Sequence, residues 1–223
     1  DLPDVTHASR PARILAPIVN GWQWSGIWTG TTGGSAAFVG QAANALSVGS
    51  AGATEPAYSV NYNYASGGSA TNLAGSPNFE PRVRIVGDPG SGCSADPLRQ
   101  FNTAAFQGPV YGSDGLESGD GYLLGCFQSA FDSSFVRNIG VGGGRNLQLR
   151  LDVFNLLNEA RIAGRNTSME LSSPADPVTI QNLPFDAQGN VIPARAVPKG
   201  AGFGVANVYQ SPRTIQIQAR ITF

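Results

Sequence analysis

Charged side chains are scarce in this sequence, where Lys, Arg, Asp and Glu together make up only 13% of 223 residues. The 14 basic residues are matched by 15 acidic ones, so the formal net charge is -1. A nucleic-acid-binding protein needs a basic patch to neutralise phosphates, and a solvated helical protein needs more surface charge. The composition argues against both classes, and we expect no nucleic-acid partner.

Histidine is almost missing as well, because His7 is the only one in the chain. A catalytic histidine needs an orienting partner, and none can be assigned to it. The glycines within 140–145 lie between two expected strands and not before a helix, which excludes a phosphate-binding loop. Asp114, Glu117 and Asp120 could gather around Ca²⁺, but their spacing matches no known frame. We expect no enzymatic activity, no cofactor and no metal site.

Long apolar runs are missing too. No stretch approaches the roughly 20 apolar residues of a membrane-spanning helix, so a membrane role would have to use strands that close into a barrel. The chain opens at Asp1 with neither the basic nor the apolar region of a signal peptide. We therefore expect a processed chain or, as we favour, a fragment of a longer protein.

The abundant features are those of strands joined by loops, including 29 Gly and 15 Pro. The clearest strand is the last stretch, residues 211–223, where apolar and polar side chains alternate from Thr214 onward. A period of two places successive side chains on opposite faces of a sheet. Such a strand can border a core beneath water, or it can border lipid outside a polar lumen.

Three further strands are expected, two of them forming a hairpin around a glycine turn, near residues 21–31, 131–141 and 146–155. Two long loops separate the strands, at 32–130, which holds short strand pieces, and at 156–210. Loops this long are unusual in a compact soluble domain but ordinary on the extracellular side of a membrane barrel. The pattern predicts an all-β fold, namely an incomplete antiparallel transmembrane β-barrel segment with long extracellular loops and Phe223 at the periplasmic end.

Alternation then assigns side chains to lipid or to lumen. The residues expected to face lipid are Trp22, Trp24, Trp28, Leu147, Leu149, Leu151, Ile215, Ile217, Ile221 and Phe223. The polar residues expected to face the lumen are Arg150, Asp152, Gln216, Gln218 and Arg220. We interpret the charged residues among them as a structural ladder and not as a substrate site.

The two cysteines, Cys93 and Cys126, both lie in the first long loop. In an oxidising compartment an even number of cysteines favours a disulfide. The alternative is two unpaired small residues. Nothing around either residue has metal-ligand spacing, and we favour the disulfide.

Five short segments follow one another along the chain: Gly21–Ile27, Pro81–Pro89, Phe101–Phe106, Leu149–Asn158 and Ser211–Gln216. Together they resemble the C-terminal part of Oar-like TonB-dependent receptors, which are outer-membrane proteins with a carboxypeptidase regulatory-like domain, a plug and a large β-barrel. The resemblance covers most of the chain. The plug and the TonB-contacting segment have no counterpart here, and the loop between Phe38 and Phe79 does not align.

The resemblance implies ligand binding and energised uptake across the bacterial outer membrane. The implied partners are the TonB complex, engaged through segments upstream of this chain, and the outer-membrane assembly machinery, which would recognise Phe223. The other implied partners are outer-membrane lipid and an unidentified extracellular ligand.

A second interpretation remains open, a secreted β-sandwich or adhesin-like binding module without transport activity. In that case the same apolar faces would pack against each other as a core. The tryptophan stripe, the alternation of short turns with long loops, and the terminal Phe223 favour the barrel.

Overall fold

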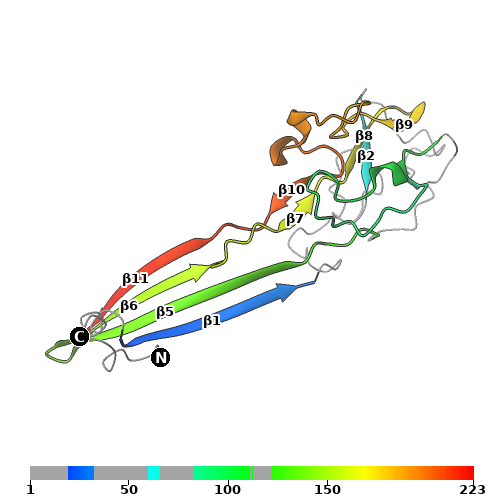
Figure 1. The fold of residues 1–223 in the computed structure, drawn as a ribbon. Helices are drawn as coiled ribbons and strands as arrows, with labels where there is room; N and C mark the ends of the chain where they lie inside the picture. Colours follow the sequence, from blue (N-terminus) through cyan, green and yellow to red (C-terminus); the bar gives the residue numbers. More distant parts are fainter. Residues whose placement is uncertain (1–19, 33–59, 66–82, 111, 113–121) are drawn as a thin grey trace. The chain divides into compact units, whose positions relative to one another are not determined.

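A computed structural model of the chain describes residues 20–32, 60–65, 83–110, 112 and 122–223. This part of the chain consists of β-strands and short 3-10 helices, without an α-helix (Figure 1). None of its helices has the length and apolar character needed to cross a membrane. The all-β class predicted from the alternating pattern is therefore confirmed.

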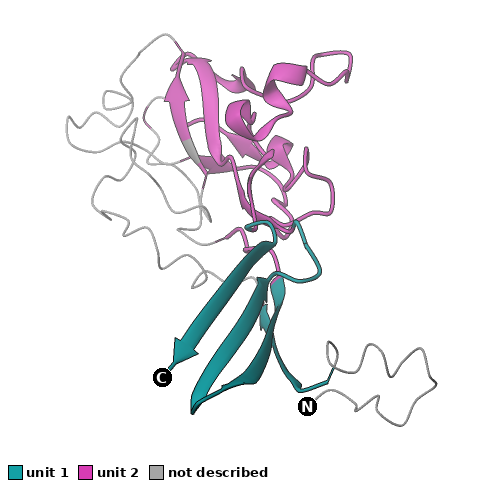
Figure 2. Cartoon of the chain, turned by 90° about the vertical axis from the view of Figure 1, so that its left-hand side faces the viewer, with its two compact units in different colours: residues 1–30, 129–160, 211–223 teal, residues 31–128, 161–210 magenta. Residues whose placement is uncertain are grey.

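The chain divides into two compact units (Figure 2). Residues 1–30, 129–160 and 211–223 make up the first, which we call the sheet unit. Residues 31–128 and 161–210 make up the second, which we call the loop unit because these two segments connect strands of the sheet unit. We refer to them as the first and the second connection.

The sheet unit contains a four-stranded sheet in the order β1-β5-β6-β11. Its strands are β1 (Trp22–Thr31), β5 (Gln128–Gly142), β6 (Arg145–Phe154) and β11 (Thr214–Thr222). β6 pairs antiparallel with both β5 and β11, and Figure 1 shows β1 running opposite to β5. Among the described residues the sheet is open, with β1 and β11 at its edges, as expected for an incomplete barrel.

A two-residue turn joins β5 to β6. Gly142 pairs with Arg145, which leaves Gly143 and Gly144 as the central residues of the turn. Their φ angles are 62° and 74°, a region that side chains other than glycine enter only with strain. Positive φ at both central positions matches the twist of the flanking strands. The glycine run therefore fixes the hairpin and its register.

Asn155 ties β5, β6 and β11 together where β6 ends, and we call its set of hydrogen bonds the Asn155 clamp. Its backbone N–H donates to Oδ1 of Asp132 on β5 at 2.8 Å, and its side-chain amide donates at 2.9 Å to the carbonyl of Ser211, which precedes β11. The same amide donates to the carbonyl of Glu159 at 3.0 Å, and its Oδ1 accepts from the Glu159 N–H at 3.0 Å. Asn155 is only 5% exposed and has a φ of 50°, a conformation that asparagine tolerates better than most residues.

The loop unit is built from short strands, where sequence analysis predicts loops. They are β2 (Asn61–Tyr64), β3 (Arg84–Ile85), β4 (Phe106–Gln107), β7 (Ile162–Arg165), β8 (Ser168–Ser173), β9 (Asp176–Ile180) and β10 (Ala206–Tyr209). The 3-10 helices are η3 (Thr103–Ala105), η4 (Pro193–Arg195) and η5 (Pro198–Gly200). The sheets are β2-β8-β9, β10-β7 and β3-β4. The expected loop at 156–210 thus holds four strands, too short to show a sustained period.

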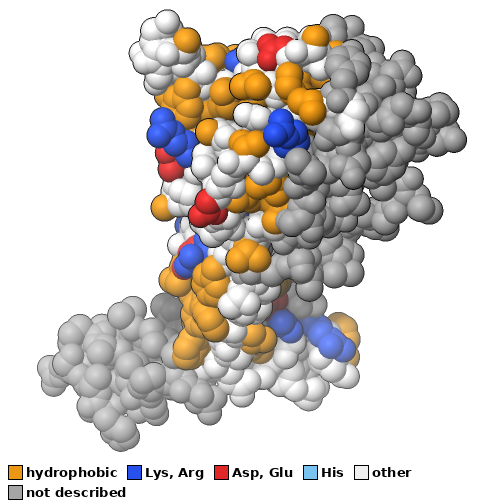
Figure 3. Space-filling model, turned by 90° about the vertical axis from the view of Figure 1, so that its right-hand side faces the viewer, with side chains coloured by type: hydrophobic (Ala, Val, Ile, Leu, Met, Phe, Trp, Pro, Cys, Tyr) orange, Lys and Arg blue, Asp and Glu red, His pale blue; other side chains and the backbone are white. Residues whose placement is uncertain are grey.

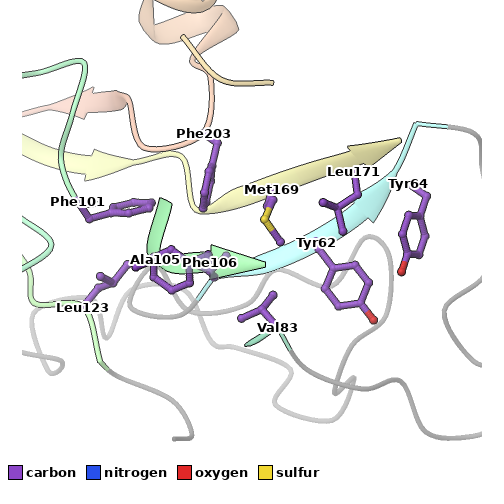
Figure 4. Close-up of a cluster of buried hydrophobic side chains, with 11 residues drawn as sticks. Tyr62, Tyr64, Val83, Phe101, Ala105, Phe106, Leu123, Met169, Leu171 and Phe203 are labelled. Carbon is purple, nitrogen blue, oxygen red and sulfur yellow. The ribbon is translucent and has the colours of Figure 1, made fainter. Parts of the chain in front are cut away.

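The two connections share one hydrophobic core (Figure 4). β2 of the first pairs in parallel with β8 of the second, with Tyr62 opposite Met169 and Tyr64 opposite Leu171. All four side chains are at most 8% exposed. The buried residues of the cluster are Val60, Tyr62, Tyr64, Val83, Phe101, Ala105, Phe106, Leu123, Met169, Leu171 and Phe203.

A disulfide joins Cys93 to Cys126 within the first connection, with their Cα atoms 5.2 Å apart. Arg165 of β7, in the second connection, is 7% exposed and reaches the chain beside both cysteines. Its Nη1 donates to the carbonyl of Gly92 and, at 2.7 Å, to the carbonyl of Leu124. A charged donor makes stronger hydrogen bonds than a neutral one. The guanidinium thereby binds the second connection to both sides of the disulfide.

Substitution of Asn155 should loosen the sheet unit. Asn155→Gly keeps the positive φ but loses the side-chain bonds, and we expect a loss of about 1–3 kcal/mol from buried groups left unpaired. Asn155→Ala should be worse by about 1 kcal/mol because alanine is also strained at this φ. Urea unfolding of the full-length protein in detergent measures both, with exposed Gln218→Ala as control. A wild-type stability for Asn155→Gly would contradict the role of the amide.

Removal of the disulfide should destabilise the loop unit. The cysteines are 33 residues apart, and the chain-entropy relation gives a loss of about 3–4 kcal/mol for a loop of this length. The paired variant Cys93→Ser/Cys126→Ser should therefore lose amide hydrogen-exchange protection around Leu123 and Met169. Protection in the β5–β6 hairpin should stay at the wild-type level, and equal loss in both places would argue against two separate units.

Candidate functional site

The register of the sheet aligns apolar positions of neighbouring strands. Ile217 of β11 lies opposite Leu151 of β6, which lies opposite Phe135 of β5. Residues paired across antiparallel strands project from the same face, so these three side chains lie together. The other β6 and β11 residues expected to face lipid fall on the same face by alternation, namely Leu147, Leu149, Ile215 and Ile221.

The tryptophans of β1 belong to this apolar face. The indole Nε1 of Trp24 donates to Oγ of Ser133 at 3.0 Å, and Ser133 is paired with Val153 of the apolar face. Trp22 and Trp28 share the side of Trp24 because they stand two and four residues away on the same strand. The hydrogen bond satisfies the polar atom of an otherwise apolar side chain.

Large hydrophobic side chains on this face are exposed to solvent. Figure 3 shows hydrophobic groups at the molecular surface. Trp28 is 62%, Ile217 81% and Phe223 90% exposed. The guanidinium carbon of Arg145 lies 5.9 Å from the centre of the Phe223 ring. Contiguous apolar surface of this kind marks a site that contacts lipid or protein.

The opposite face is polar. β11 contributes Gln216, Gln218 and Arg220, which lie opposite Asp152, Arg150 and Gln148 of β6. Nε of Arg150 donates to both carboxylate oxygens of Asp152, at 2.9 and 2.8 Å. Nε2 of Gln148 donates to Oδ1 of Asn138 on β5 at 3.0 Å. The structure thus brings all five residues expected in the lumen onto one face, and two of them form an ion pair.

Strand β5 interrupts the separation of the faces. Arg137 lies opposite Leu149 on the apolar face, whereas Val136 lies opposite Arg150 on the polar face. Ile27 is also an exception, since it stands between the tryptophans of β1 and is 67% exposed. The sequence does not assign the β5 side chains to either face of the sheet, and the register with β6 shows which face each of them shares.

In the part of the chain that the structure describes, no three His, Cys, Asp or Glu residues group closely enough to hold a metal ion. His7 lies outside the described residues, as do Asp114, Glu117 and Asp120.

Carboxylates of the loop unit hold turns. Asp186 accepts from the backbone N–H groups of Gln188 and Asn190 at 2.9 and 2.8 Å. The hydrogen bond from the Asn190 side chain is the main reason why the pKa of Asp186 lies below its usual value. A hydrogen bond from the Thr179 side chain likewise lowers the pKa of Asp176. Both carboxylates stabilise the folded unit while ionised, and this contribution is lost as the pH falls through the lowered pKa values.

Comparison with known proteins agrees with this two-faced sheet. A family model described as an outer membrane beta barrel domain matches residues 1–216. No curated protein and no solved structure matches the chain. The match spans the strands from β1 into β11 together with both connections. It confirms the predicted bacterial outer-membrane localisation, and the chain belongs to the outer membrane β-barrel family.

Proposed function

We propose that this chain is the C-terminal part of a TonB-dependent receptor, in which the loop unit binds an extracellular ligand and the sheet unit forms part of the barrel wall. One observation carries the proposal: both long connections fold into a single unit with a shared hydrophobic core, whereas β5 and β6 are joined by two residues. A receptor needs an ordered surface on the extracellular side of the membrane and little more than turns on the periplasmic side. The proposal assigns no enzymatic step to the chain.

The segments that resemble Oar-like receptors support this assignment because they occupy structurally important places. Leu149–Asn158 contains most of β6 and the Asn155 clamp, and Ser211–Gln216 contains the carbonyl that the clamp binds. Phe101–Phe106 contributes three residues to the core of the loop unit.

In the proposed arrangement the apolar face meets lipid and the polar face lines the lumen. Exposed residues such as Trp28 and Ile217 would then be covered by acyl chains, which removes the cost of their contact with water. The Arg150–Asp152 pair would stay hydrated in the lumen. The loop unit would lie outside, and the Gly143–Gly144 turn in the periplasm.

Binding of TonB tests the proposal directly. The full-length receptor, expressed from the complete gene and purified in detergent, is titrated with the purified periplasmic domain of TonB by calorimetry. We expect one-to-one binding that disappears when the TonB-contacting segment upstream of this chain is deleted. The surface variant Gln188→Ala should bind like wild type. A full-length protein that binds no TonB would instead be an adhesin-like surface protein without energised uptake.

Arginine substitution on neighbouring residues tests the two faces. Leu149→Arg should place a charge in lipid and impair assembly by about 2–4 kcal/mol near the membrane midplane, whereas Gln148→Arg should be tolerated in the lumen. The amount of heat-modifiable full-length protein in outer-membrane fractions measures the difference. Equal tolerance of both substitutions would refute the assigned faces.

A further inference from the structure

The hydrophobic core of the loop unit is divided between the two connections. The first connection supplies eight buried residues of the cluster and the second supplies Met169, Leu171 and Phe203. Phe203 is fully buried, and its ring centre lies 5.2 Å from that of Phe101 and 6.0 Å from that of Phe106. Without the second connection, the aromatic rings of the first would therefore lose partners that remove them from water.

Backbone hydrogen bonds cross between the connections as well. The N–H of Gln100 donates to the carbonyl of Gly204 at 2.9 Å, and the N–H of Ala206 donates to the carbonyl of Pro97 at 2.7 Å. The parallel pairing of β2 with β8 adds a ladder between them. Buried backbone groups need such partners, so each connection depends on the other for part of its hydrogen bonding.

The strand ends from which the two connections leave, and to which they return, lie at one end of the sheet. The first runs from the end of β1 to the start of β5, and the second from the end of β6 to the start of β11. Because neighbouring strands run in opposite directions, these ends lie on the same side, opposite the Gly143–Gly144 turn (Figure 1). In a membrane, both segments must cross before they can meet on the far side.

We propose that the loop unit acts as an assembly latch. Its core forms only after both connections have crossed the outer membrane. The folded unit then holds the β5–β6 hairpin in place, because withdrawal of the connections to the periplasm would require the core to unfold. The disulfide does not provide this closure, since both of its cysteines lie in the first connection. The proposal rests on the orientation in the proposed function, with the loop unit outside.

Surface labelling of the full-length protein in intact cells tests the latch. Lys199, an exposed residue of the second connection, is replaced by cysteine. Cells that carry this Lys199→Cys protein, the parent of the further variants, are treated with a membrane-impermeant maleimide. We expect the parent to be labelled. Adding Phe203→Ala should lower both labelling and the heat-modifiable fraction several-fold, while the more conservative Phe203→Leu should lie between. Asp186→Ala, which disturbs a turn made within the second connection alone, is the matched control and should behave like the parent.

The outcomes separate the latch from the orientation. If Phe203→Ala loses hydrogen-exchange protection of the core but reaches the surface as fast and as fully as the parent, the latch is refuted. An equal defect in Asp186→Ala would also refute it, because any weakness of the loop unit would then suffice. An unlabelled Lys199→Cys parent would refute the orientation itself, whereas loss of TonB binding alone would leave the latch intact.

Discussion

The register between β6 and its two neighbours is the constraint on which the rest of the sheet depends. A shift of one residue would move every side chain of a strand to the other face. The two-residue turn sets this register on one side of β6, and the Asn155 clamp fixes the entry of β11 on the other. With the register in place, leucine, isoleucine and tryptophan gather on one face and amide, carboxylate and guanidinium groups on the other. The two-faced character of the wall follows from two short local structures.

The loop unit solves a different physical problem. A long surface segment rich in glycine and serine has little apolar surface to bury, so it gains little by folding alone. Two such segments that leave the same end of a sheet can combine their few aromatic residues into one core. The Phe101, Phe106 and Phe203 rings and the Arg165 guanidinium all act at this junction, and the disulfide constrains the first segment beside it. The outcome is an ordered surface unit made from segments that look like loops.

Sequence reasoning succeeds where structure is local and periodic. Strands β6 and β11 alternate strictly enough for the sequence to show their two faces, whereas the longer β5 mixes apolar and polar residues and does not. It fails in the loop unit because strands of two to six residues carry no measurable period and because their partners are distant in sequence. Asn61 and Ser168 pair across 168 − 61 = 107 residues, a relation that no local pattern contains. The clamp role of Asn155 was likewise hidden, since it depends on Asp132 and Ser211 from other parts of the chain.

The three tryptophans of the sequence all stand on β1, and on one face of it. Intrinsic indole fluorescence of this segment therefore comes from a single strand at one edge of the sheet. Transfer of that strand from water to acyl chains would shift the emission to shorter wavelength, while changes elsewhere in the segment would leave it almost unaltered. The chain thus carries its own optical reporter, confined to the one edge strand where the aromatic side chains are concentrated.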